Sequence, residues 1–260
     1  MKTISLLGCG WLGLPLAKQL MEKGYTVKGT TTTEDKITVL ERAGVVPYLL
    51  VLSEDSALID FVALEAFLAD SNCLIIAIPP KLRGAVKENF VLKIKNIIPS
   101  IEQSSIKNIL FVSSTAVYKD TIHFEEWTTV DSLAEPDTEN GKQLLEVELL
   151  LQNVLSITTT IVRMGGLIGE DRHPVKFLAG KKGIENPDAP VNLIHQNEAV
   201  ALLISIIEQG EWGKTINGVA PYHPTRKVYY TEKALAMGLP IPEFNEEGIS
   251  VGKRILGSVL

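Results

Sequence analysis

The sequence has little of the chemistry that metal sites and disulfides require. Its 260 residues include only two cysteines, Cys9 and Cys73, and four scattered histidines. Neither the number nor the spacing of these residues matches a zinc site or a disulfide framework. We therefore expect no metal, no disulfide and a reducing, cytoplasmic environment.

Long apolar runs and an excess of positive charge are also missing. No run approaches the roughly 18 apolar residues of a membrane span, so we expect no membrane association. Six residues separate Lys2 from Cys9, whereas a secretory apolar core has roughly 7–15, so we do not interpret Cys9 as a lipidated residue. A net charge of −6 and a pI near 5.4 argue against a nucleic-acid partner, because no basic surface would offset phosphate repulsion.

The chain does have a regular alternation of strand-like and helix-like segments. Strands are predicted at 3–7, 25–29, 46–51, 73–78, 108–113 and 157–163, and helices at 13–23, 34–43, 60–69, 86–98 and 139–152. This alternation predicts an α/β fold of the Rossmann type, with a doubly wound parallel sheet covered on both faces. In such sheets ligands bind beyond the carboxyl ends of the strands.

A glycine-rich turn joins the first predicted strand to the first helix, Gly8-Cys9-Gly10-Trp11-Leu12-Gly13. In this context a G-x-G-x-x-G string indicates a dinucleotide site, the alternative being a merely structural turn. We expect Gly8 to allow the tight turn, Gly10 to let a pyrophosphate approach, and Gly13 to let the helix pack on the strand. Trp11 and Leu12 belong to the same predicted cofactor site, with packing of Trp11 against another lobe as its other interpretation.

The end of the second predicted strand bears on the choice of cofactor. NAD-binding domains usually place an acidic residue there, but this chain has four threonines, 30–33, before Glu34 and Asp35. We therefore expect NADP in preference to NAD, although an ordinary strand end and helix cap remains the alternative. The predicted 2′-phosphate site consists of Thr30, Thr31, Thr32 and Lys36.

The texture of the chain changes after residue 164, where Gly, Pro and Asn become frequent. A strand at 191–194, a helix at 197–208, a strand at 215–219 and a helix from Thr225 to Met237 are predicted there. We expect residues 1–164 to form an NAD(P)-binding domain, with contributions from 191–208. Residues 165–260 are expected to form a small, interleaved C-terminal substrate lobe.

Three strings besides the glycine turn resemble one family. They are Val112-Ser113-Ser114-Thr115-Ala116-Val117-Tyr118, the segment 161–169, and the segment 191–200 with its Asn-Leu-Ile-His core. Together these look like the extended short-chain dehydrogenases/reductases, the NAD-dependent epimerase/dehydratase superfamily. The resemblance covers nearly the whole chain.

The resemblance implies a catalytic constellation with one serious departure. In the family a serine, here Ser114, orients the substrate oxygen, while a Tyr-x-x-x-Lys pair supplies the acid/base and holds the nicotinamide ribose. Lys142 matches the lysine, but the tyrosine position falls on Thr138. An aliphatic hydroxyl cannot replace a phenol of tuned pKa, so the chain resembles the atypical members. Tyr118 is a substitute proton carrier by hypothesis, and a packing residue in the alternative interpretation.

The resemblance also implies contacts around these residues. Further cofactor contacts are expected at Ile78, Pro79, Pro80 and Ser113. Tentative substrate contacts are expected at Thr115, Gly166, Arg172 and His173, although the last two are nearly as consistent with a solvated loop.

Two classes of function remain open. The first is an NAD(P)-dependent oxidoreductase, epimerase or dehydratase that acts on a sugar-nucleotide-like or other polar small molecule. The second is a catalytically silent NAD(P)-binding protein that senses redox state or regulates a partner. By analogy alone, the helix at 139–152 is a possible homodimer contact.

Overall fold

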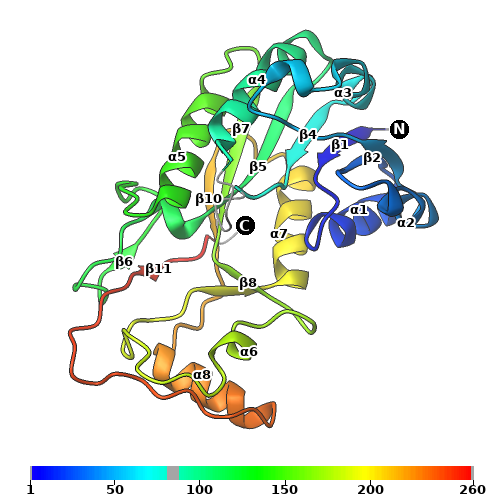
Figure 1. The fold of residues 1–260 in the computed structure, drawn as a ribbon. Coiled ribbons are helices and arrows are strands. Elements are labelled where there is room, and N and C mark those ends of the chain that lie inside the picture. The colour runs from blue at the N-terminus through cyan, green and yellow to red at the C-terminus, as the bar shows by residue number, and fades with distance from the viewer. Residues whose placement is uncertain (1, 81–87, 259–260) are drawn as a thin grey trace.

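The computed structural model describes residues 2–80 and 88–258, and its centre is a parallel sheet of seven strands (Figure 1). The strand order is β10-β7-β5-β4-β1-β2-β3, which reverses direction between β1 and β4 and so creates a topological switch point. The predicted doubly wound Rossmann sheet is confirmed. Its strands are β1 (Thr3–Leu7), β2 (Thr26–Thr31), β3 (Val46–Leu49), β4 (Cys73–Ile76), β5 (Asn108–Ser114), β7 (Thr158–Met164) and β10 (Thr215–Gly218).

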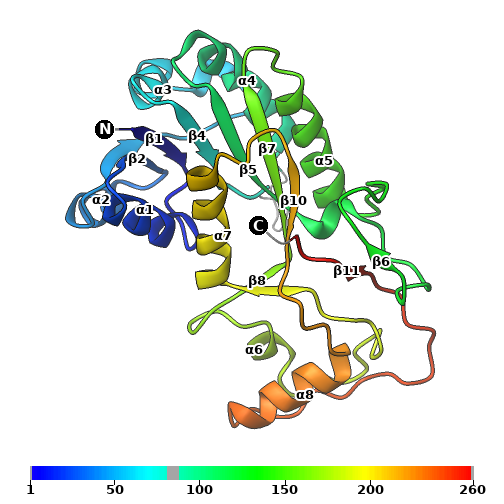
Figure 2. The ribbon, with the colours of Figure 1, turned by 180° about the vertical axis from the view of Figure 1, so that it is seen from behind.

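Helices cover both faces of the sheet (Figures 1 and 2). One apolar core lies between the sheet and α1 (Gly13–Glu22), α2 (Ile37–Arg42) and α7 (Gln196–Gln209). A second core lies between the other face and α3 (Phe61–Leu68), α4 (Phe90–Gln103) and α5 (Glu139–Gln152). Because both faces are covered, a central strand such as β4 is buried at every residue.

Two predicted boundaries differ from the structure for local reasons. The second strand continues through Thr30 and Thr31, which pair with the neighbouring strand at Tyr48 and Leu49. The helix expected at 86–98 begins at Phe90, because Asn89 caps it, and it continues past Pro99 to Gln103. Buried Ile97 and Ile101 hold the last turn against the core. Residues 86 and 87 of that prediction lie outside the described residues.

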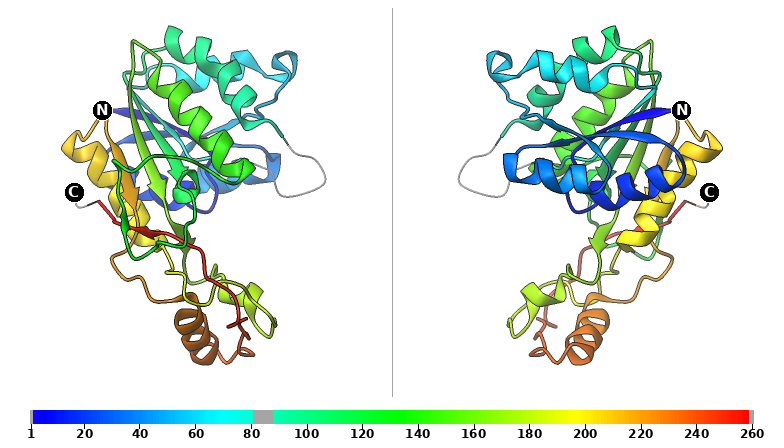
Figure 3. Two further views of the ribbon diagram at one scale, coloured as in Figure 1. Left: turned by 90° about the vertical axis from the view of Figure 1, so that its left-hand side faces the viewer. Right: turned by 90° about the vertical axis from the view of Figure 1, so that its right-hand side faces the viewer.

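A smaller lobe lies beyond the carboxyl edge of the sheet (Figure 3). It contains β8 (Gly166–Ile168), β9 (Leu193–His195), α6 (Val175–Leu178) and α8 (Arg226–Ala236), around a separate small core. The predicted division left residues 215–219 in this lobe. The structure corrects this, because β10 pairs with β7 and forms the edge of the main sheet.

The chain then returns from the lobe to the sheet domain as a C-terminal strap, residues 250–258. Within the strap, β11 (Arg254–Ile255) pairs with β6 (Trp127–Thr128), and neither short strand was predicted. Asn217 of β10 fixes the end of the strap: its side-chain amide donates to the carbonyl of Leu256, and its backbone N–H donates to the hydroxyl of Ser258. The strap therefore belongs structurally to both parts of the molecule.

A buried ion pair ties the strands to α5. The carboxylate of Glu148, 2% exposed, accepts from the guanidinium of Arg163, 8% exposed, with a shortest distance of 2.7 Å. Ser113 donates to the same carboxylate at 2.5 Å, and Arg163 donates to the Tyr118 hydroxyl at 2.8 Å. Tyr118 in turn donates to the side-chain oxygen of Asn217 at 3.0 Å. One connected network thus joins β5, α5, β7 and β10.

The ion pair generates a stability prediction. Glu148→Leu leaves the buried Arg163 without its counter-charge, so we expect the free energy of unfolding to fall by about 3–5 kcal/mol. Urea denaturation measures this change. Glu146→Leu is the matched control, because Glu146 is exposed on the outer side of α5, and we expect a change within about 0.5 kcal/mol. Equal losses for the two variants would show that the pair does not stabilise the fold.

Candidate functional site

A cavity of about 480 Å³ opens at the switch point of the sheet, beyond the carboxyl ends of β1, β2 and β4. Eight of the predicted cofactor residues line it, and none of the other six does. The eight are Gly8, Gly10, Thr30, Thr31, Thr32, Lys36, Ile78 and Pro79. The volume falls in the range typical of pockets for small organic ligands.

The glycine turn forms one wall of this cavity, and each glycine has its own structural reason. Gly8 has a φ of 105°, which a side chain would strain, and its N–H donates to the Thr30 hydroxyl at 2.8 Å. A Cβ on Gly13 would lie 2.1 Å from the carbonyl oxygen of Gly8, so only glycine lets the helix approach the turn. A Cβ on Gly10 would meet no atom within 4 Å. Gly10 therefore keeps space open beside the cavity.

The start of α1 completes the wall next to Gly10. The helix begins after Leu12 with no side-chain cap and no acidic residue in its first turn. Backbone N–H groups at such a helix start bind anions, helped by the helix dipole. The open space at Gly10 and the uncapped helix start together fit the pyrophosphate of a dinucleotide.

The threonines at the end of β2 make different contacts. The Thr30 hydroxyl holds Gly8, and the Thr31 hydroxyl lies 3.4 Å from that of Thr33. Thr32 and Lys36 are exposed and line the cavity. The 3₁₀ turn Glu34–Lys36 carries Glu34 and Asp35, but neither lines the cavity.

The lining of the cavity does contain one carboxylate, that of Glu88. It lies 2.5 Å from the ammonium group of Lys93, which also lines the cavity. The charge that Glu88 adds to the wall is therefore offset within the wall itself.

Cys9 lies between the first two glycines but offers no reactive thiol. Its sulfur is packed against Gly29, where a Cβ would approach within 2.4 Å of it. Burial raises the pKa of Cys9 to about 12, and burial raises that of Cys73 to the same value. Both cysteines are free and buried, so both act as small apolar residues.

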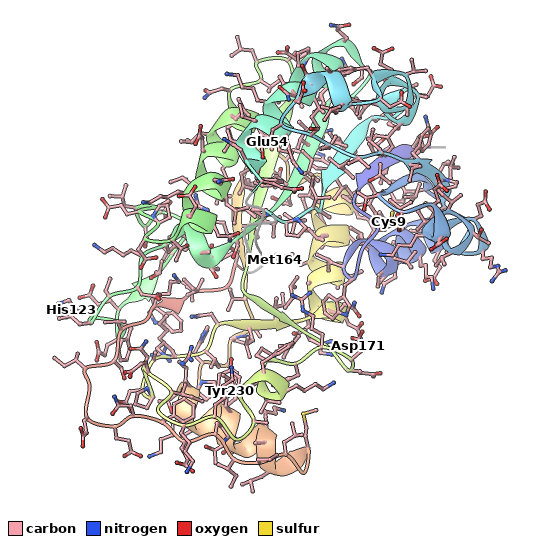
Figure 4. The ribbon with its side chains drawn as sticks, in the orientation of Figure 1. Cys9, Glu54, His123, Met164, Asp171 and Tyr230 are labelled. Atoms are coloured by element: carbon pink, nitrogen blue, oxygen red, sulfur yellow. The ribbon has the colours of Figure 1, made fainter. Side chains whose placement is uncertain are left out.

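The side chain of Trp11 does not line the cavity and contacts the lobe instead. Its indole N–H donates to Asp171 at 2.9 Å, and the guanidinium of Arg172 lies 5.1 Å from the ring centre. Figure 4 labels Asp171 in the loop that follows β8. Trp11 thus joins the glycine turn to the lobe, as its other interpretation held, and Arg172 is used in the same contact rather than in the second cavity described below.

Four other predicted cofactor residues also lie off the cavity. Leu12 is buried in the α1 core, and Gly13 serves the helix contact described above. Ser113 donates to Glu148 inside the sheet network. Pro80 is half-buried but does not line the cavity.

The structure also corrects the prediction for Lys142. The inner face of α5 carries Gly141, Leu144 and Glu148, all buried, whereas Lys142 lies on the exposed face. Thr138 is the N-cap residue, and its hydroxyl accepts the Gly141 N–H at 3.1 Å. Thr138 lies just before the helix and Lys142 lies on its exposed face, so neither side chain faces the sheet.

A tyrosine and a lysine four residues apart would have to lie on this inner face of α5 in order to face the sheet. On the same side of the helix as Glu148, the two preceding positions at four-residue spacing are Leu144 and Asn140. Neither side chain is ionisable. A phenol–ammonium pair is thus absent from the described inner face of α5.

The geometry favours the packing interpretation of Tyr118. The residue is 1% exposed, and its hydroxyl is engaged by both Arg163 and Asn217. The neighbouring Ser114 is half-buried and accepts the N–H of Ala116 at 3.2 Å, which caps the short turn Thr115–Val117. Ser114 is accordingly the more accessible hydroxyl at the end of β5.

A second cavity, of about 250 Å³, lies between the end of β5 and the lobe. Of the predicted substrate residues, Thr115 lines it, whereas Gly166, Arg172 and His173 do not. The lining residues that the sequence did not identify include two cations, Arg226 and Lys253. Lys253 comes from the C-terminal strap, 138 residues after Thr115, so no local motif could have revealed it.

His173 belongs to the core of the lobe instead. Its Nδ1 accepts the N–H of Val175 at 3.2 Å, and its Nε2 lies 3.0 Å from the hydroxyl of Tyr229. Burial lowers the pKa of His173, and the positive charges of Lys233 and Lys176 lower it further. A neutral, hydrogen-bonded imidazole therefore stabilises the lobe and does not face the second cavity.

Among residues 2–80 and 88–258, no three His, Cys, Asp or Glu side chains are grouped as potential metal ligands. Over the same ranges, no helix has both the length and the apolar character needed to cross a membrane.

Comparison with known proteins assigns the chain to a family. No family model matches it. Protein YeeZ of Escherichia coli K12 is 34% identical over 259 residues, which cover 99% of this chain and 92% of YeeZ. The chain belongs to the YeeZ family. The same identity and coverage are found for YeeZ of Escherichia coli O157:H7.

Solved structures similar to this chain confirm the fold that its sequence motifs led us to expect, which is the fold of the extended short-chain dehydrogenases/reductases. A putative NAD-dependent epimerase/dehydratase from Methylobacillus flagellatus has a TM-score of 0.77 at 21% identity, covering 98% of this chain and 89% of its own. UDP-glucose 4-epimerase from Thermotoga maritima, solved with UDP-glucose, has a TM-score of 0.78 at 14% identity, covering 99% and 90%. A superfamily protein from Agrobacterium tumefaciens, solved with bound NAD, has a TM-score of 0.76 at 15% identity, covering 98% and 89%.

The different surroundings of Gly10 and Gly13 generate a second prediction. Gly13→Ala places a methyl group against the Gly8 carbonyl, so we expect the free energy of unfolding to fall by about 1–3 kcal/mol. Gly10→Ala meets open space, so we expect it to be unchanged or to rise by about 0.4–1 kcal/mol. Urea denaturation of the two variants measures the difference. Equal destabilisation by both substitutions would contradict the roles assigned to the two glycines.

Proposed function

We propose that this protein binds a nicotinamide dinucleotide in the first cavity and a sugar-nucleotide-like or other polar small molecule in the second. The observation that carries the proposal is the open space at Gly10, which adjoins both the first cavity and the uncapped start of α1. Two similar structures, one solved with NAD and one with UDP-glucose, support it by analogy.

Particular residues would hold the dinucleotide. Gly10 and the first-turn N–H groups of α1 would receive the pyrophosphate. Thr32 and Lys36 are the exposed groups at the end of β2, and they would receive the 2′-phosphate of NADP, so NADP is the proposed preference. When bound, the cofactor supplies a nicotinamide ring that gives or accepts hydride.

The residues of the chain itself favour a catalytically silent NAD(P)-binding protein over an oxidoreductase. Hydride transfer to a carbonyl needs a group that moves a proton at the substrate oxygen. Ser114 can orient an oxygen, but Asn140 and Leu144 occupy the register in which a phenol and an ammonium would be needed. Tyr118 is withdrawn into the buried network. We infer a dinucleotide-binding sensor or regulator, located in the cytoplasm.

Calorimetry with NADP⁺ and NAD⁺ tests the cofactor. We expect stoichiometric binding of NADP⁺, weakened about tenfold in Lys36→Ala because a charge-assisted contact is lost, with NAD⁺ binding unchanged. Lys18→Ala removes an exposed lysine that does not line the cavity and is the control. Equal affinity for both dinucleotides would overturn the NADP preference, and no binding of either would make the chain a cofactor-free scaffold.

A turnover assay separates the silent class from the enzymes; because an epimerase or dehydratase returns its cofactor unchanged, products formed from UDP-glucose are analysed as well as the absorbance. NADPH and NADH are mixed with a broad panel of carbonyl compounds, and NADP⁺ and NAD⁺ with alcohols and UDP-glucose, while the absorbance of the reduced nicotinamide is followed. We expect dinucleotide binding without turnover across the panel, because the proton-transferring pair is missing. Consumption of the reduced cofactor with any member would establish the oxidoreductase class instead, and Tyr118→Phe would then show whether that phenol carries the proton.

A further inference from the structure

The second cavity contains a cation that no carboxylate of the described residues neutralises. Arg226 is the first residue of α8, and its guanidinium lies 6.0 Å from the ring centre of Tyr230. The Nε of Arg226 is buried and makes no hydrogen bond to any part of the chain that the structure describes. Lys253, the other cation of the lining, pairs with Asp120 at 3.0 Å. The three charged groups of the lining therefore leave one net positive charge, located at Arg226.

Two buried hydroxyls face the same cavity. Tyr230, labelled on α8 in Figure 4, and Thr115, from the turn after β5, are each 7% exposed and line the cavity. Neither hydroxyl hydrogen-bonds to another of the described residues. Burial raises the pKa of Tyr230, only partly opposed by Arg226, so this phenol is a neutral donor. Both hydroxyls are therefore free to hydrogen-bond a ligand in the cavity.

The C-terminal strap forms one side of the second cavity. Gly252 exchanges two backbone hydrogen bonds with Thr121, of 2.7 and 2.9 Å, and Asn192 holds the strap through the carbonyl of Lys253 and the N–H of Ile255. The strap thus closes one side of a cavity of about 250 Å³. That space has the volume of about eight waters, which suits a small polyol acid or phosphate. A nucleoside diphosphate with its sugar is several times larger and would extend out of the cavity.

We propose that the second cavity binds a small anionic polyol, a carboxylate or a phosphate monoester, with Arg226 as the anchor of its anionic group. The fork of an arginine matches both anions, and the two hydroxyls and the Lys253–Asp120 pair face the remaining oxygens. This narrows the second ligand of the proposed function, on which it rests, to the polar small molecules and away from intact sugar nucleotides.

Calorimetry on the full chain, with and without saturating NADP⁺, tests the proposal. The probes are gluconate for a carboxylate, glycerol 3-phosphate for a phosphate monoester, and UDP-glucose for an intact sugar nucleotide. We expect one of the two small anions to bind and UDP-glucose to bind at least tenfold more weakly. Binding of UDP-glucose in preference, or of neither small anion, overturns the proposal.

Variants assign the binding to the cavity. We expect Arg226→Ala to weaken binding of the small anion at least tenfold, because a charge-assisted contact is lost, and Tyr230→Phe to weaken it about threefold. Lys227→Ala is the matched control, because Lys227 is exposed, pairs with Glu246 and does not line the cavity. Unchanged affinity in Arg226→Ala overturns the proposal. If thermal unfolding shows that this variant is not folded, Tyr230→Phe decides, and unchanged affinity for the small anion in Tyr230→Phe overturns the proposal.

The result is distinguishable from failure of the proposed function. Anion binding that depends on Arg226 but occurs without any dinucleotide binding supports this inference and overturns the cofactor assignment. Dinucleotide binding without binding of either small anion supports the cofactor assignment and overturns this inference.

Discussion

The buried pair of Glu148 and Arg163 is the constraint on which the rest of the architecture depends. A guanidinium and a carboxylate taken out of water must be matched in charge and in hydrogen bonds. Here Ser113 donates a further hydrogen bond to Glu148, and the Tyr118 hydroxyl accepts one from Arg163. Tyr118 in turn donates to Asn217, which extends the network to β10. The relative positions of β5, β7, β10 and α5 are thereby fixed. Hydroxyls that serve this network are not available for chemistry at the carboxyl edge of the sheet.

The same network also shapes the second cavity. Asn217 receives the Tyr118 hydroxyl and also holds the strap at Leu256 and Ser258. The strap then brings Lys253 beside Asp120 and closes the cavity above Arg226. Tyr118 and Asn217 do not line the cavity, but they fix the end of the strap that forms one of its sides. The first cavity depends less on distant contacts, because the glycine turn, β2 and the start of α1 are adjacent in the sequence, although residues 77–79 and 88–93 also line it.

That difference explains how much the sequence could predict. The sheet and the first cavity follow from local signals: apolar strands, the glycine spacing and the threonines at the end of β2. The positions expected for the tyrosine and the lysine were placed wrongly. Thr138 and Lys142 are four residues apart, as the family pattern requires, but they do not lie on the side of α5 that faces the sheet. The stripe of Gly141, Leu144 and Glu148 sets the inner face, and this periodicity was the signal to use. Contacts such as that of Trp11 with Asp171 join residues 160 apart and leave no local pattern.

The identity of the residues on the inner ridge of α5 has a structural consequence as well as a functional one. Leu144 is 3% exposed and packs in the same core as Phe111 and Val147. A lysine at this position needs a bound anion or a phenol to offset its desolvation, whereas a leucine stabilises the core whether or not a ligand is present. The chain has a core residue where the oxidoreductases need an ionisable one. This part of the α5 core is consequently complete without a ligand, which is compatible with the proposed sensor.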